Sequence, residues 1–125
     1  MTQLSATQVL PSRSLNIALW ALQALLAVAF LAAGGSKLAG VQQMVAMFDQ
    51  IGLGQWFRFV TGTVEVGAAL AVLLPRFTAF AAGVLSMTMV FAFVTHLFVI
   101  GGSPVAAAVL AALSGFVAYG RRPRS

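Results

Sequence analysis

Residues 15–36 read LNIALWALQALLAVAFLAAGGS, a segment without a formally charged side chain. A helix needs about 20 mostly apolar residues to cross the hydrocarbon core of a bilayer, so this segment predicts a membrane-spanning helix. A cleavable secretory signal peptide is the alternative interpretation, because Arg13 precedes the segment and small residues end it. The apolar run is longer than the roughly 7–15 residues of such a signal, which favours a retained helix.

The composition of the chain indicates the same class of protein. Of the 125 residues, 61% are hydrophobic and 7% are charged, and the mean hydropathy is +1.00. These values lie far outside the range of soluble domains and predict an integral membrane protein. The sequence contains no cysteine, which excludes disulfides and thiolate sites within it.

Three further apolar spans are predicted at about 56–74, 77–100 and 104–119. Pro75 ends the first of these, because proline cannot continue a helix. Ser103 and Pro104 suit the N-cap and the first position of the last helix. We therefore predict a single all-α membrane domain over residues 1–125, built as a four-helix bundle with antiparallel, up-and-down helices.

The connection between the first two spans predicts a short amphipathic helix over residues 41–51. Apolar side chains recur there at helical spacing, while glutamines and an aspartate fall on the other side. The apolar face consists of Val41, Met44, Val45, Phe48 and Ile51. We expect this helix to lie flat at the outer membrane interface. It is interpreted either as a packed surface connection or as a lid over a site that opens to the outer leaflet.

Basic residues predict the orientation, because short cytoplasmic loops carry an excess of Lys and Arg. In a four-span chain the two termini and the turn at Pro75 share one side. That side holds Arg13, Arg76, Arg121, Arg122 and Arg124, and the other side holds Lys37 and Arg58. We expect a multi-pass protein of the cell membrane with cytoplasmic N- and C-termini. The basic tail, residues 120–125, and the other helix-end arginines form no single patch, which argues against nucleic-acid binding.

Lys37, Glu65 and His96 are ionisable residues at or inside the apolar spans. Such groups are costly in a bilayer and are functional candidates by default. At 1.5 Å per residue, Glu65 lies roughly 13 Å and His96 roughly 6 Å inside the outer boundary, and Lys37 lies at it. We predict one cluster in the outer half, with a Lys37–Glu65 ion pair and His96 within hydrogen-bonding range. An interfacial anchor, a structural ion pair and a packing histidine are the respective alternatives.

Other residues are predicted to support this cluster. Gln23 lies on the same helical stripe as Lys37, and Thr61 and Thr95 neighbour the other two members. Gly34 and Gly62 leave space for a close helix crossing. One histidine and two acids on separate elements fall short of a metal site, so no metal is predicted.

At these residues the chain resembles the DoxX-like family of small four-helix membrane proteins, over about residues 15–119. Residues 30–38, FLAAGGSKL, are similar to the family's F-x-x-A-G-x-x-K-L, and residues 62–65 to its G-x-x-E. A histidine at the end of the third span completes the match. The resemblance marks Gly34, Lys37, Gly62, Glu65 and His96. It implies an association with membrane redox systems such as thiosulfate:quinone oxidoreductase, and assigns no catalytic role to any residue.

Three functional hypotheses follow. The chain is an accessory or quinone-interacting subunit of a membrane redox system, with a quinone and a membrane or periplasmic redox protein as partners. Alternatively it transports or binds a small molecule or lipid, which with four spans requires a homo-oligomer. In the third hypothesis it is a non-catalytic scaffold of a membrane complex. No sequence motif identifies a bound cofactor or an enzymatic reaction.

Overall fold

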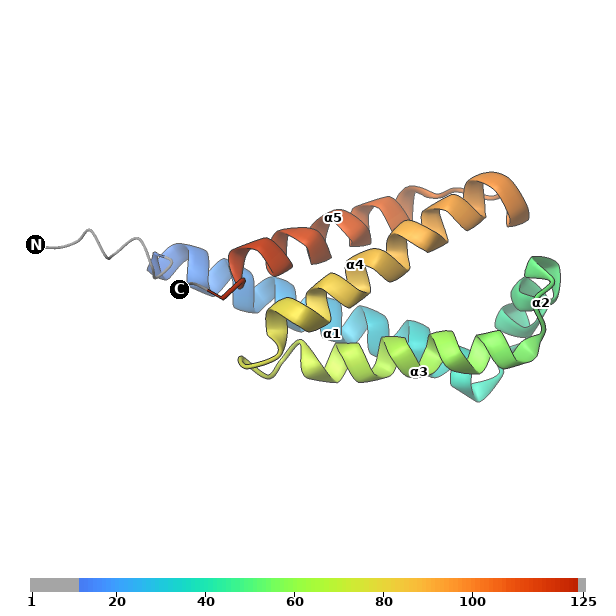
Figure 1. Ribbon diagram of the computed structural model, residues 1–125, viewed down its shortest axis with the longest axis horizontal. Coiled ribbons are helices and arrows are strands. Elements are labelled where there is room, and N and C mark those ends of the chain that lie inside the picture. The colour runs from blue at the N-terminus through green and yellow to red at the C-terminus, as the bar shows by residue number, and fades with distance from the viewer. Residues whose placement is uncertain (1–11, 124–125) are drawn as a thin grey trace, which may run out of the picture.

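The computed structural model describes residues 12–123, which form helices and contain no strand. Five α-helices follow one another, and a π-helical turn, η2, extends the fourth (Figure 1). The elements are α1 Arg13–Ala39, α2 Gln42–Ile51, α3 Gln55–Ala71, α4 Thr78–Thr95, η2 His96–Ile100 and α5 Val105–Gly120. The all-α fold class is therefore confirmed for this part of the chain.

The four longer α-helices form two packed pairs, α1 with α3 and α4 with α5. Contacts of α3 with α4 and of α1 with α5 join the pairs. Figure 1 shows that the pairs lie close together near the turn at residues 72–77 and diverge toward the end where α2 lies. Because α2 contacts both α3 and η2, it lies across the wide end of this wedge.

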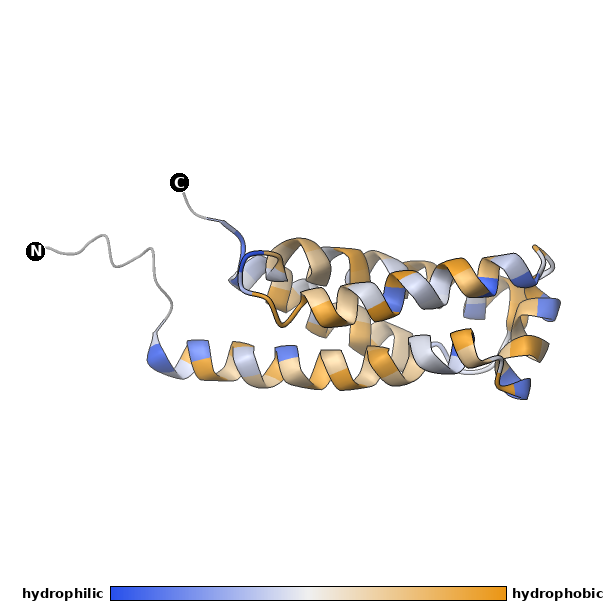
Figure 2. Ribbon diagram, turned by 90° about the horizontal axis from the view of Figure 1, so that it is seen from below, coloured by the Kyte–Doolittle hydropathy of each residue, from blue (hydrophilic) through white to orange (hydrophobic). Residues whose placement is uncertain are grey.

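The outer surface of the helices is largely apolar. Figure 2 shows hydrophobic residues along the helices, with hydrophilic residues mainly near the two ends. α1 and the continuous α4–η2 helix are long and apolar enough to cross a membrane, and α5 is a shorter apolar helix. Exposed large apolar side chains include Ile17, Val28, Leu70, Phe80 and Phe91. Such a surface suits lipid, because the helical backbone satisfies its own hydrogen bonds.

Two helix ends differ from the predicted bounds. α1 continues past residue 36 and stops at Gly40, whose φ of +73° suits glycine. α3 ends at Ala71 instead of residue 74. Pro75 has no N–H for the Ala71 carbonyl and disfavours helical geometry in the residue before it. The N–H of Leu74 bonds to that carbonyl instead, at 3.0 Å.

The start of α5 is shifted by one residue from the prediction. Pro104, and not Ser103, is the N-cap, and the helix begins at Val105. The Ser103 hydroxyl still accepts a hydrogen bond from the N–H of Val105, at 3.3 Å. The predicted polar contact at this helix start is therefore present, although the predicted cap position was wrong.

Candidate functional site

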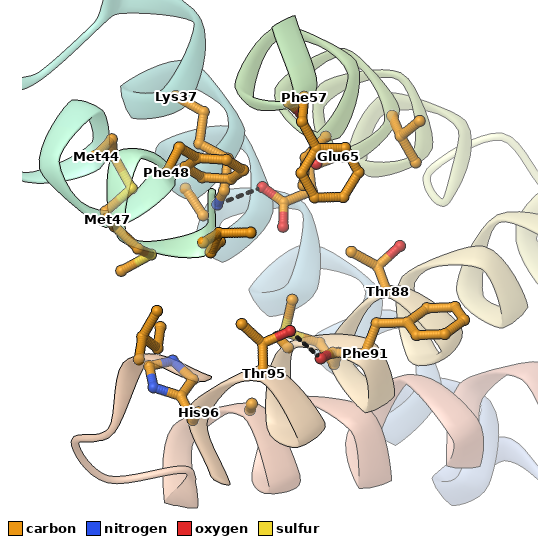
Figure 3. A pocket seen from close by; sticks show the side chains of 18 of the residues that line it. Lys37, Met44, Met47, Phe48, Phe57, Glu65, Thr88, Phe91, Thr95 and His96 are labelled. Carbon is orange, nitrogen blue, oxygen red and sulfur yellow. Dashed lines mark hydrogen bonds and ion pairs between the residues drawn. The ribbon is translucent and has the colours of Figure 1, made fainter. Parts of the chain in front are cut away.

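The wide end of the wedge contains a cavity of about 710 Å³. Its walls come mainly from α2, α3 and the α4–η2 helix (Figure 3). Most lining side chains are apolar, among them Met44, Met47 and Phe48 of α2. The polar lining residues are Lys37, Thr61, Glu65, Thr88, Thr95 and His96.

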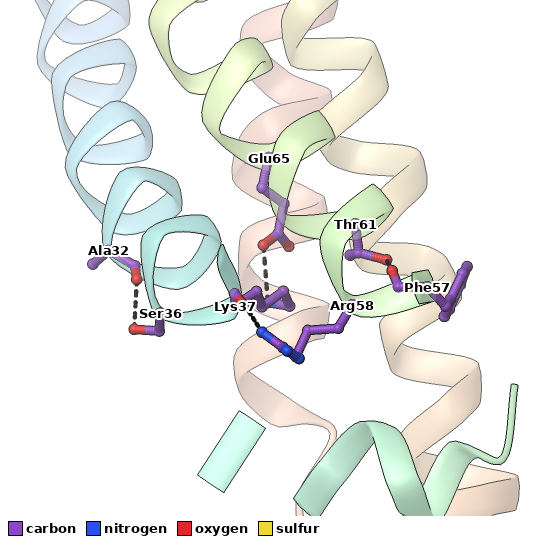
Figure 4. Close-up of polar contacts among 7 residues, drawn as sticks. All are labelled: Ala32, Ser36, Lys37, Phe57, Arg58, Thr61 and Glu65. Atoms are coloured by element: carbon purple, nitrogen blue, oxygen red, sulfur yellow. Dashed lines mark hydrogen bonds and ion pairs between the residues drawn. The ribbon is translucent and has the colours of Figure 1, made fainter. Parts of the chain in front are cut away.

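Lys37 and Glu65 form an ion pair on one wall of the cavity. The Nζ atom of Lys37 lies 2.8 Å from Oε1 of Glu65 (Figure 4). The two side chains are 12% and 1% exposed. Within residues 12–123, only Oε1 of this carboxylate takes part in a hydrogen bond. Since an ionised carboxylate can accept several hydrogen bonds, Oε2 of Glu65 is an unused acceptor at the cavity.

Two glycines bring α1 and α3 close enough for this ion pair. A Cβ atom added to Gly34 would lie 2.9 Å from the carbonyl oxygen of Gly62. A Cβ atom added to Gly62 would lie 3.0 Å from the carbonyl oxygen of Gly34 and 3.0 Å from Cβ of Lys37. Such distances leave no room for a methyl group against backbone. The crossing therefore depends on both glycines, and it sets Lys37 directly beside the helix that carries Glu65.

Arg58 is a further buried charge beside the ion pair, and it was missing from the predicted cluster. Its side chain is 7% exposed. Nη1 donates to the backbone carbonyl of Lys37 (Figure 4), which also accepts a hydrogen bond from the N–H of Gly40 at 3.3 Å. Nε donates to Oε1 of Gln55 at 2.7 Å, and Nε2 of Gln55 donates to Asp49 of α2 at 2.8 Å. This chain of hydrogen bonds connects α2 with the end of α1.

His96 lines the same cavity but lies across it from the ion pair (Figure 3). Its Nδ1 atom is 3.0 Å from the carbonyl oxygen of Gly101. Because a carbonyl only accepts, Nδ1 carries the hydrogen in this contact, and Nε2 is the acceptor of a neutral ring. Within the described residues, no hydrogen bond joins His96 to Lys37 or Glu65. The predicted direct contact is therefore absent, although all three residues line one cavity.

Thr61 and Thr95 lie on the cavity wall. Their hydroxyls donate to carbonyls of their own helices, from Thr61 to Phe57 at 2.9 Å and from Thr95 to Phe91 at 2.7 Å. Each oxygen keeps a lone pair that can accept a further bond. Thr88, which was not among the predicted residues, lines the wall in the same way.

Gln23 lies elsewhere, at the narrow end of the wedge, where it is fully buried. Its Nε2 donates to the carbonyl of Val72 at 3.0 Å, and its Oε1 accepts from Nε of Arg121 at 2.8 Å. Nη1 of Arg121 also donates to Oδ1 of Asn16 at 2.8 Å. Burial lowers the pKa of the Arg121 guanidinium from its ordinary value. Gln23 thus links α1 to α5 and to the end of α3, and the prediction that it supports the cluster was wrong.

Three apolar side chains of α3 and α4 that line the cavity are also exposed: Val60 (47%), Val64 (40%) and Phe91 (67%). The cavity is therefore not enclosed by buried side chains on these two helices.

The described residues contain no group of three or more His, Cys, Asp or Glu side chains that could hold a metal ion. Neither a curated protein nor a solved structure matches the chain. The profile of the DoxX-like family matches residues 21–119. The match includes both walls of the cavity and the glycine crossing of α1 and α3. The chain is therefore a membrane protein that belongs to the DoxX-like family.

Proposed function

We propose that this protein binds a quinone in the cavity at the wide end, as an accessory subunit of a membrane redox system. One observation carries the proposal: a mainly apolar cavity, with exposed apolar residues in its lining, has the Lys37–Glu65 pair on one wall and His96 across from it. A lipid-soluble molecule with two polar atoms on opposite sides of a small ring fits this arrangement.

The proposal includes a membrane arrangement. α1, α3, α4 and α5 cross the plasma membrane in alternating directions as an antiparallel bundle, and both termini are cytoplasmic. Arg121 and Arg122 at the narrow end support this orientation through the positive-inside tendency. Trp56, exposed at the start of α3, suits the opposite interface, where tryptophan is enriched. The cavity then lies in the outer half of the membrane, with α2 along the outer surface.

The size and the polar groups of the cavity support a quinone as ligand. Small-molecule sites are typically about 300–1,000 Å³ and mostly apolar, with few polar groups, and this cavity of about 710 Å³ lies in that range. Lys37 has N–H groups to donate to a quinone carbonyl. Glu65 through Oε2 and His96 through Nε2 can each accept a hydrogen bond from a quinol hydroxyl.

A bound quinol supplies two electrons and two protons when it is oxidised. In this proposal Glu65 and His96 orient the hydroxyls and accept protons, and the ammonium of Lys37 stabilises the carboxylate of Glu65 until a proton arrives. The electrons pass to a membrane or periplasmic redox protein that associates with this chain. The apolar residues of α2 exclude water from the ring.

Binding is tested with the protein in lipid nanodiscs, titrated separately with a tail-less benzoquinone and with its quinol. The wild-type protein is expected to bind both ring forms. Glu65→Gln replaces an acceptor oxygen with an amide, so it is expected to weaken quinol binding more than quinone binding. Quinone extracted from protein purified in native lipids gives an independent measurement. The proposal fails if the wild-type protein binds neither ring and no quinone co-purifies.

A scaffold role is the second candidate, and one observation favours it: the Lys37–Glu65 pair joins α1 to α3 at their close crossing. A scaffold needs the pair for assembly and needs no ligand. Under that function, Glu65→Gln would change the stability of the complex, while His96→Ala, across the cavity, would change neither assembly nor the activity of the complex.

A further inference from the structure

A narrow groove lies between α3 and α4, next to the cavity. Its volume is about 220 Å³, and Val64 lines both spaces. No residue that lines the groove has a polar side chain: Val64, Gly67, Ala68 and Ala71 of α3, and Phe80, Ala81 and Val84 of α4. The two spaces therefore adjoin, and polar groups lie at one end only.

The groove runs along the helices from the level of Glu65. On α3, its lining residues extend from Val64 to Ala71, which at 1.5 Å per residue is roughly 10 Å. A chain attached to a ring beside Glu65 can thus follow the seam between α3 and α4 for about that length.

Gly67 keeps the groove open. A Cβ atom added to Gly67 would meet no atom within 4 Å, so the glycine is not required by a close helix contact, unlike Gly34 or Gly62. Its lack of a side chain leaves room along α3 at the point where the groove leaves the cavity beyond Val64.

We propose that the groove is a subsite for the linear apolar tail of the ligand, whose compact polar head lies beside Lys37 and Glu65. This inference rests on the proposed function and specifies its ligand as a head group with a long chain. The assignment rests on the shared lining residue Val64, which makes the two spaces neighbours, and on the polar atoms at one end. The alternative occupant is an acyl chain of a bilayer lipid. Such a chain would fill the groove independently of any ligand in the cavity.

The test uses Gly67→Leu, which places a side chain in the open groove. Gly83→Leu is the matched control, because Gly83 of α4 also has open space around its added Cβ and lines neither space. Both substitutions replace a helical glycine by the same residue, so both raise helix propensity. Binding is measured in phosphatidylcholine nanodiscs with one dimethoxybenzoquinone ring, either without a side chain or with a decyl chain.

Gly67→Leu is expected to weaken binding of the decyl compound by about fivefold and to leave the tail-less ring within about twofold. The change is modest because lipid chains are as apolar as the groove, and only packing distinguishes them. Gly83→Leu is expected to change neither. Each comparison uses one ligand in the same lipid, so the partitioning of that ligand into the bilayer is equal for the wild-type protein and the variant.

Equal binding of the decyl compound by the wild-type protein and Gly67→Leu would overturn the tail subsite, while binding of the tail-less ring would leave the proposed function standing. Failure of both compounds to bind the wild-type protein, with no quinone co-purifying from native lipids, would reject both proposals. Circular dichroism and thermal unfolding establish that Gly67→Leu is folded, and Gly67→Ala, which is smaller, is expected to give an intermediate loss.

Discussion

Arg58 holds the end of α1 through the carbonyl of Lys37, and the ammonium of the same lysine binds Glu65. Backbone and side chain of one residue are thus fixed by two residues of α3. Because Arg58 also bonds to Gln55, which bonds to Asp49, the position of Lys37 is connected to the helix that covers the cavity.

Arg58→Gln is therefore expected to destabilise the protein by about 1–3 kcal/mol, since it removes the charged hydrogen bond to the Lys37 carbonyl and leaves Oε1 of Gln55 without its donor. Arg76→Gln is the control, because Arg76 is exposed in the turn between α3 and α4, and we expect no more than about 0.5 kcal/mol. Unfolding in mixed detergent micelles, followed by circular dichroism, measures both. Equal losses for the two variants would show that Arg58 does not stabilise the end of α1.

The Lys37–Glu65 pair is expected to show energetic coupling in a double-mutant cycle. Removing either partner leaves the other buried without its counter-charge. The losses of stability of Lys37→Met and Glu65→Leu should therefore add up to more than the loss of the double variant. A coupling energy of about 1–3 kcal/mol is expected for groups in direct contact. The free energies of unfolding of the wild-type protein, both single variants and the double variant give this value. Additive losses would contradict a functioning ion pair.

Gly34→Ala is expected to destabilise by about 1–3 kcal/mol, because the new methyl group would overlap α3. The neighbouring Gly35 gives a matched control, since its added Cβ meets nothing within 4 Å. Gly35→Ala is expected to be neutral or stabilising by up to about 1 kcal/mol through helix propensity. Thermal unfolding of both variants in one detergent measures the difference, and a Gly34→Ala protein as stable as the wild type would contradict the close crossing.

Thr61→Val is expected to weaken binding of the tail-less quinol by about threefold to tenfold, because it removes a hydroxyl oxygen from the cavity wall. Thr63→Val is matched to it, since the Thr63 hydroxyl also bonds to its own helix, at 2.7 Å from the Phe59 carbonyl, and is exposed away from the cavity. Nanodisc titrations of both variants are compared with the wild type. Identical affinities for the two variants would exclude Thr61 from the binding site.

The ion pair was the part of the site that the sequence predicted best. Counting residues along two helices gives the distance of each side chain from the predicted outer boundary. These distances predicted that Lys37 lies near Glu65. The same argument misplaced Gln23, because the seven-residue spacing establishes a common helix face and not a common depth. Gln23 and Lys37 share a side of α1, but about 21 Å of helix separates them at 1.5 Å per residue.

The hydrogen-bond partners of His96 and Arg58 could not be predicted from the sequence. The contact of His96 with Gly101 depends on the π-helical turn that ends α4, and the sequence gives no periodic pattern for a single such turn. Arg58 was interpreted as a charge at the outer side of the membrane. Its burial depends on where α1 ends, because the carbonyl of Lys37 is its partner. The signal in the sequence is an arginine in the first turn of α3, at a level where α1 ends at a glycine.

The hydrogen bonds of Gln23 and Arg121 tie α1 to α3 and α5 at the narrow end, whereas at the wide end the contact between α2 and η2 includes one long hydrogen bond, 3.4 Å from Gln50 to Ile100. The helices are thus joined by several polar contacts at the narrow end, and the proposed ligand site lies at the wide end. A rotation of the helix pairs about the narrow end would change the width of the wide end and leave the Gln23 contacts intact. The site would then select its ligand through the polar atoms of Lys37, Glu65 and His96 more than through the diameter of the quinone ring.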